Sequence, residues 1–277
     1  MKRFTTIAAL AAVGAVAVFL FAGKVCAERM TVAPQGVKSA SVKIEMGGRE
    51  LTIAGGADSL LDGDFNSNSR AQPVIKYKVD HGKGALIVKH EASGAVAKRV
   101  GNVWNISLNN NILLDLDVGF STGKCNLLLA GLLLNKLKLD AFSGNAQVDL
   151  SGFHPSLASA DIAMDNGALN VKMNGEYPAL QTLEVGLTNG GLTVDLNGTW
   201  KRDLNASINS YAAGVTVILP RNTGVRVEVK NRNGRVKADG LTKENGAYVN
   251  NAFGKSNVTL RLEVKDINGV VNLVLAP

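Results

Sequence analysis

The sequence predicts an all-β protein, a β-solenoid or β-roll of strand–turn–strand units of about 22 residues. Three observations support this prediction. The 277 residues include 30 glycines and 26 asparagines, and both residue types favour tight turns because they tolerate positive φ. Similar segments recur at nearly constant spacing along the second half of the chain. Within these segments apolar and polar side chains alternate, as in a strand with one buried face.

Residues 1–27 predict an export signal. Lys2 and Arg3 precede 19 residues without charge, and a small-residue cleavage site ends at Ala27. The uncharged run is also long enough for an uncleaved membrane anchor, and Cys26 is a candidate for lipidation. We therefore expect an exported protein, either periplasmic or on the cell surface, whether the segment is cleaved or kept as an anchor.

Charge is distributed unevenly along the chain. Removing the signal lowers the formal net charge from +7 to +4. Residues 28–113 carry 11 basic and 8 acidic side chains, residues 114–200 carry 4 and 9, and residues 201–277 carry 12 and 6. The mature protein thus has an acidic middle and a basic end. Only Cys125 lies beyond the signal, which excludes an internal disulfide in a cleaved chain.

The repeat is clearest around its turns, which fall at Gly123, Gly144, Gly167, Gly190, Ala213, Gly234 and Gly269. Four residues after each turn an apolar column reads Leu127, Val148, Val171, Val194, Val217, Ala238 and Leu273. A unit that cannot bury its own apolar face needs neighbours, so we expect each coil to stack on the preceding one. Residues 114–277 are therefore predicted to form regular solenoid repeats.

An antiparallel hairpin meander is the alternative fold, because Asn-Gly pairs such as Asn166-Gly167 favour two-residue hairpin turns. Residues 28–113 repeat the pattern less cleanly and are predicted to form irregular N-terminal β coils. Within them we expect a polar connector over residues 55–71, with a short helical turn over 57–61, and a second connector over residues 92–102.

Three stretches have unusual sequences: EMGGRELTIAGGADSLLDGDF after Ile44, NISLNNNILLDLDVGF after Trp104, and KLDAFSGNAQVDLSG after Leu137. Together they resemble the toast-rack family of exported bacterial proteins. That family is related to the C-terminal domain of membrane proteins that respond to cell-wall-active antibiotics. The resemblance implies an all-β fold of stacked strands, and it supplies no catalytic residues. This chain departs from the family's Gly-Ala-Gly turns and lacks the several transmembrane helices of those regulators.

Residues typical of catalysis or metal binding are scattered. His81, His90 and His154 are too far apart in the sequence for a zinc site and are expected at the surface or in turns. No nucleophile elbow or phosphate loop is present, so no cofactor is expected. A polysaccharide-active β-helix enzyme needs a compact group of charged side chains on one outer face. Asp149 and Asp195 instead share a column with Lys172, which indicates alternating charge on a solvated face.

The strongest candidate site is anion binding at the basic end, by Arg226, Lys230, Arg232, Arg235 and Lys237. Such a cluster attracts anionic envelope polymers, lipid head groups or an acidic envelope protein. The alternative interpretation is a charged cap that prevents solenoids from stacking end to end. Nucleic acid is not expected, because no aromatic residues interleave with the basic ones.

The sequence therefore predicts a non-enzymatic envelope protein, a rigid β scaffold that is adhesin-like or a binding module related to envelope stress. The alternatives are the polysaccharide-active enzyme and a lipid-anchored assembly subunit. Neither the sequence pattern nor the charge predicts an oligomeric state.

Overall fold

The computed structural model describes residues 27–67, 73–90 and 102–277. The predicted export signal lies outside the described residues except for Ala27, and the predicted connector 92–102 lies outside them except for Asn102. All regular structure in the described residues is β-strand. Among these residues no helix is long and apolar enough to cross a membrane.

The strands fall into an N-terminal group, a middle group and a C-terminal group. The N-terminal group is β1 (Ala27–Val32), β2 (Ser39–Met46), β3 (Glu50–Ala57), β4 (Leu61–Ser67), β5 (Pro73–Asp80), β6 (Lys83–His90) and β7 (Asn102–Asn109). The middle group is β8 (Leu113–Leu128), β9 (Leu134–Asp149), β10 (Ser159–Lys172), β11 (Glu176–Tyr177), β12 (Thr182–Asp195), β13 (Thr199–Trp200) and β14 (Leu204–Leu219). The C-terminal group is β15 (Gly224–Asn231), β16 (Arg235–Asp239), β17 (Thr242–Glu244), β18 (Ala247–Val249), β19 (Thr259–Asp266) and β20 (Val270–Leu275).

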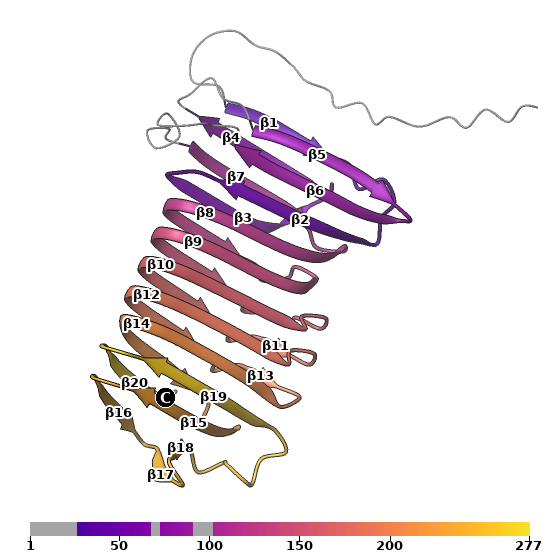
Figure 1. Cartoon of the computed structure of the whole chain (residues 1–277). Helices are drawn as coiled ribbons and strands as arrows, with labels where there is room; N and C mark the ends of the chain where they lie inside the picture. The colour runs from indigo at the N-terminus through magenta and orange to yellow at the C-terminus, as the bar shows by residue number, and fades with distance from the viewer. Residues whose placement is uncertain (1–26, 68–72, 91–101) are drawn as a thin grey trace, which may run out of the picture.

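The middle of the molecule is a stack of parallel coils, as Figure 1 shows for β8, β9, β10, β12 and β14. Each of these long strands bends at a corner, so that one strand contributes to two faces of the stack. Neighbouring coils pair residue for residue; Leu139 lies beside Ile162, for example. The predicted solenoid is confirmed. The hairpin meander is wrong for the repeats, because Asn166-Gly167 and Asn189-Gly190 each turn a corner within one strand and do not reverse it. Asn245-Gly246 does reverse the chain, as a two-residue hairpin between β17 and β18.

Glycine with positive φ occupies this corner in β8, β9, β10 and β12, whereas Ala213 occupies it in β14. Gly190 has φ +131°, and a Cβ atom on it would lie 1.9 Å from the carbonyl oxygen of Gly167 in the neighbouring coil. Beside it, Asn189 Nδ2 donates a hydrogen bond of 3.1 Å to Asn166 Oδ1. The amide ladder and the glycine column let successive corners approach at the spacing of a parallel sheet, roughly 4.8 Å.

The coils at the C-terminal end do not stack in sequence order. Strands β19 and β20 pair with β14 on one side and with β15 and β16 on the other. In Figure 1 the yellow β19 and β20 accordingly follow β14, and β15 and β16 lie farther out. The expectation that each coil stacks on the preceding one is therefore wrong here. The columns are apolar whichever coil lies next to β14, so the sequence pattern does not determine the order in which the coils stack.

The N-terminal end has the same kind of inversion. Strands β2 and β3 lie between β8 and the outer pair β6 and β7, with parallel ladders on both sides. Beyond them β4, β1 and β5 add antiparallel strands. The predicted connector 55–71 thus contains β4, and bends replace the predicted helical turn because the chain passes directly from β3 to β4.

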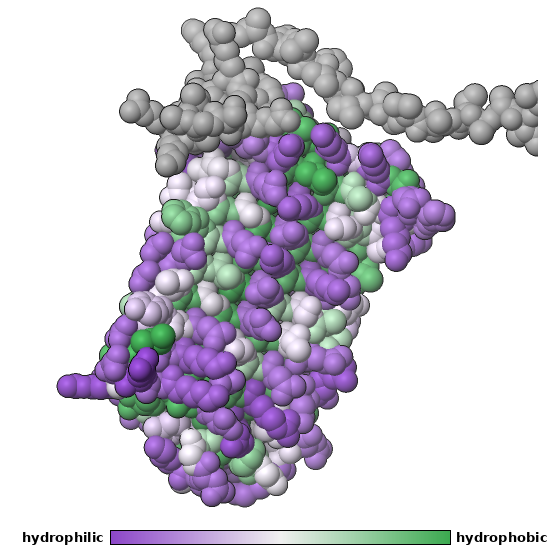
Figure 2. All heavy atoms as spheres, in the orientation of Figure 1, coloured by the Kyte–Doolittle hydropathy of each residue, from purple (hydrophilic) through white to green (hydrophobic). Residues whose placement is uncertain are grey.

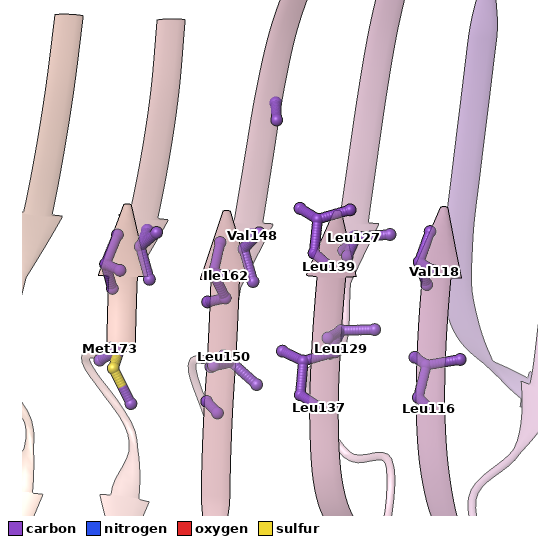
Figure 3. Close-up of a cluster of buried hydrophobic side chains, with 14 of the residues drawn as sticks. Leu116, Val118, Leu127, Leu129, Leu137, Leu139, Val148, Leu150, Ile162 and Met173 are labelled. Atoms are coloured by element: carbon purple, nitrogen blue, oxygen red, sulfur yellow. The ribbon is translucent and has the colours of Figure 1, made fainter. Parts of the chain in front are cut away.

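Apolar columns fill the inside of the coils. Figure 3 shows members of these columns on adjacent strands, including Leu116 on β8, Leu137 on β9 and Ile162 on β10. Leu139, Val148 and Ile162 are fully buried. Burial of each such side chain contributes about 1.5–3 kcal/mol. Because the coils are narrow, Val, Leu and Ala suffice to fill them, which agrees with the low aromatic content.

A buried stack of three rings lies in the segments that join β9 to β10, β10 to β12 and β12 to β14. His154 stacks on Tyr177 with ring centroids 5.8 Å apart, and Tyr177 stacks on Trp200 at 4.8 Å. His154 is fully buried, so the surface alternative is wrong for it, although the predicted turn follows directly at residues 155–156. Burial lowers the pKa of His154, which keeps the ring neutral. The signal for this stack was the 23-residue spacing of the three rings in the sequence.

Candidate functional site

The basic end, defined as Arg226, Lys230, Arg232, Arg235 and Lys237, belongs to the outermost full coil of the C-terminal end. Arg226 and Lys230 lie on β15, Arg235 and Lys237 on β16, and Arg232 in the corner between these strands. In Figure 2, hydrophilic residues cover most of the visible surface at this end of the molecule. The structure therefore places all five residues on one coil, at the end of the stack.

Two of the five cations are paired with carboxylates. Arg226 forms an ion pair with Glu228, and Lys230 forms one with Glu263 of the neighbouring coil. Lys265 Nζ lies 3.2 Å from the same Glu263 carboxylate. The side-chain hydrogen bond from Lys230 is the largest cause that lowers the pKa of Glu263. Carboxylates of the protein already neutralise Arg226 and Lys230, so these two residues contribute less to binding an external anion than unpaired cations would.

The other three cations, Arg232, Arg235 and Lys237, form no ion pair within the described part of the chain. All three side chains are exposed. We call them the unpaired triad. Each can therefore accept an external anion without first breaking an internal ion pair.

The corner that carries Arg232 is held by its neighbour Asn231. Asn231 Oδ1 accepts a hydrogen bond of 2.6 Å from Gly234 N, and its Nδ2 donates one of 3.1 Å to the carbonyl of Gly269. One residue beyond Arg232, Asn233 Nδ2 donates a hydrogen bond of 2.9 Å to Asn268 Oδ1. These bonds tie the corner to the neighbouring coil, so Arg232 and Arg235 project from a braced backbone.

A hollow of about 570 Å³ lies at the corner of the coils formed by β2, β8, β9 and β10. Met164 and other buried apolar side chains line it beside Phe142, whose exposed fraction is 60%. Glu45, Asp140 and Asp165 also line it. Sequence reasoning missed this hollow; an exposed aromatic in a corner column was the available signal. Glu45 and Asp140 are engaged in ion pairs of 2.7 Å with lysines on their own strands, so this acidic rim is largely neutralised.

Charges alternate along the outer faces of the middle coils. On one face Lys43, Asp117, Lys138 and Asp161 follow one another in register on four successive coils. On the other, Lys172 lies between Asp149 and Asp195, with Lys172 Nζ 3.5 Å from Asp149 Oδ2. Opposite charges in adjacent positions stabilise the sheet modestly. The described residues hold no group of three His, Cys, Asp or Glu side chains arranged for a metal ion.

Comparison with known proteins identifies one family and several solved structures to which this chain is similar. The family model for the N-terminal domain of toast-rack, DUF2154, matches residues 21–174. A candidate cell adhesion protein from Clostridium sporogenes is 23% identical, with 91% of this chain and 100% of that chain covered and a TM-score of 0.48. A comparison with curated proteins gives no match.

Two further solved structures are less similar. A candidate adhesin from Bacteroides fragilis is 11% identical, with 91% of this chain and 98% of that chain covered and a TM-score of 0.38. A candidate lipid-binding protein from Parabacteroides distasonis is also 11% identical, with 91% of this chain and 97% of that chain covered and a TM-score of 0.29.

Proposed function

The chain belongs to the toast-rack family, and from this premise we propose that it is a non-enzymatic binding module of the cell envelope, exported through its N-terminal segment. A rigid β-solenoid carries the binding surface at its C-terminal end, and that surface binds an anionic partner. The expectation of export rests on residues 1–27, with their basic start, uncharged run and small-residue cleavage site.

The observation that carries this proposal is the contrast within the basic end. Arg226 and Lys230 are matched with carboxylates, whereas the unpaired triad of Arg232, Arg235 and Lys237 has none within the described residues. Unpaired exposed cations cost little to leave in water and gain by meeting an anion. Their position on the outermost full coil makes them accessible to a large partner.

The solenoid supports this role by holding the binding surface rigidly. Continuous parallel ladders join β8, β9, β10, β12 and β14, and β19 and β20 extend them to the coil of the unpaired triad. Each coil contacts the next over two faces, so a load on one end is carried along the whole stack. A scaffold of this kind presents a binding surface at a fixed distance from its other end.

The test uses a polyuronate, an anionic polymer without a peptide backbone. The full chain is titrated with fluorescent polyuronate at low and at high salt, beside a variant with Arg232→Glu, Arg235→Glu and Lys237→Glu. We expect the variant to bind at least tenfold more weakly. Binding to the unchanged chain should fall as salt rises, because exposed charges are screened.

A matched control separates the local cluster from net charge. The triple variant Lys76→Glu, Lys78→Glu and Lys83→Glu changes the net charge by the same amount at the opposite end, where all three side chains are exposed. It should bind polyuronate nearly as well as the unchanged chain. Equal losses in both variants would contradict the proposal, and so would cleavage of the polymer, which would indicate an enzyme.

A further inference from the structure

The C-terminal end of the solenoid is covered on only one of its two ladders. Strand β18 pairs antiparallel with β15, with Arg226 beside Val249 and Val227 beside Tyr248. Strand β16 pairs in parallel with β20 alone. Its outer edge has no strand partner among residues 27–67, 73–90 and 102–277. Figure 1 shows β16 as the last strand on its side of the stack.

We propose that β16 is a docking edge to which an extended, acidic segment of another protein adds as a further strand. This inference rests on the proposed function and narrows its anionic partner to a peptide chain. An open edge offers backbone N–H and C=O groups that an added strand can satisfy, while side-chain positions select the sequence of that strand.

The side chains of β16 define the partner. Arg235 and Lys237 point outward and are exposed, whereas Val236 and Ala238 are half-buried against the end of the apolar core. An added strand continues both patterns, because side chains alternate between the faces of a sheet. Its outward residues therefore need carboxylates to face Arg235 and Lys237. Its inward residues need apolar side chains to cover Val236 and Ala238.

A second copy of this chain fits the edge less well than an acidic strand does. Antiparallel pairing of β16 with itself, centred on Lys237, places Arg235 opposite Asp239 but leaves the two lysines opposite one another, and parallel pairing in register opposes every like charge. At the other end of the molecule β5 also has a single strand partner among the described residues, and it presents exposed Lys76 and Lys78. Like charges in opposing positions are unfavourable, so a partner with acidic outward residues is favoured over head-to-tail stacking.

The experiment measures binding of a short fluorescent peptide of alternating valine and glutamate to the full chain by anisotropy. A second peptide carries methyl groups on two consecutive central amide nitrogens, which places one methyl on each edge of the strand and leaves the charge unchanged. We expect the methylated peptide to bind at least tenfold more weakly. Equal binding of the two peptides would show that charge alone holds them and would overturn the inference.

A charge exchange tests the side-chain positions. The double variant Arg235→Glu and Lys237→Glu should bind the glutamate peptide at least tenfold more weakly than the unchanged chain does. It should bind a peptide with lysine in place of glutamate more tightly. The control Lys38→Glu and Arg202→Glu makes the same change in charge at two exposed residues that lie outside the strands, and it should leave both affinities unchanged. Unaltered binding of the glutamate peptide to the Arg235 and Lys237 variant would overturn the inference.

The outcomes separate this inference from the proposed function. If the chain binds polyuronate and binds the two glutamate peptides with equal affinity, the proposed function is supported and strand addition at β16 is contradicted. If the chain binds neither polyuronate nor either peptide, the proposed function and this inference are both contradicted. Sedimentation of the unchanged chain as a dimer that Val236→Pro converts to monomer would assign the edge to a second copy and also overturn the inference.

Discussion

The substitution Gly190→Ala, compared with Gly191→Ala, tests whether corner glycines are required by the fold. Gly190 has φ +131°, and an added Cβ atom would lie 1.9 Å from the Gly167 carbonyl oxygen. Gly191, the next residue, has an ordinary φ, and an added Cβ atom would meet nothing within 4 Å. The two substitutions add the same methyl group to neighbouring residues of one strand, so they differ only in local geometry.

The cost of Gly190→Ala has two parts. An L-residue held in this backbone conformation costs about 1–3 kcal/mol. The methyl group also forces apart two coils that are joined by the Asn189–Asn166 hydrogen bond, whose loss costs roughly 1 kcal/mol. Together they lower the free energy of unfolding by about 3 kcal/mol. Gly191→Ala should be neutral or stabilising by about 0.4–1 kcal/mol, because alanine reduces the freedom of the unfolded chain.

Urea unfolding followed by tryptophan fluorescence measures both variants. A loss of 3 kcal/mol corresponds to a melting temperature lower by roughly 6–12 °C for a domain of this size. The reasoning would be refuted if the two variants had free energies of unfolding within about 0.5 kcal/mol of one another. Ala213 shows how that could occur, because it follows Gly190 in the same column with a φ outside the left-handed region.

Three further predictions concern buried groups. Tyr177→Phe should cost about 1–3 kcal/mol, because the hydroxyl donates a 2.6 Å hydrogen bond to the Leu150 carbonyl, whereas Tyr211→Phe, at an exposed side chain, should cost nothing measurable in urea unfolding. The pKa of His154 is lowered in the folded state, so below pH about 6.5 the unfolded state binds a proton that the folded state does not. The free energy of unfolding should therefore fall between that pH and the folded pKa, and this fall should be smaller in His154→Phe. Burial raises the pKa of Cys125 to about 12, so alkylation at pH 8 should require unfolding, and rapid labelling of the folded chain would contradict this.

Sequence reasoning predicted the coils well because column identity is a local property. A residue such as Val194 is apolar, alternates with polar neighbours, and recurs in register with Val171 and Val217, so its burial follows from the pattern. The ring stack was missed because His154 was judged as a titratable group and not as a member of a column. Its alignment with Tyr177 and Trp200 makes it an apolar-facing ring that happens to be ionisable.

The order of the end coils could not be read from the sequence, and this order determines where the site lies. In sequence order the coil of β19 and β20 would close the stack, with β15 and β16 inside it. The unpaired triad would then lie on an interior coil, and β16 would have neighbours on both edges. The observed inversion instead places β19 and β20 against β14, where Val271 and Leu273 pair with Val215 and Val217.

This inversion also explains the division of charge at the end of the molecule. Glu263 enters on β19, next to β15, and there pairs with Lys230 and Lys265. On the other ladder β20 brings Val270, Asn272 and Val274 beside Arg235, Lys237 and Asp239. The coil that covers the core thus supplies a carboxylate to β15 and none to β16. The same packing that completes the apolar columns therefore leaves β16 both open at its edge and unneutralised.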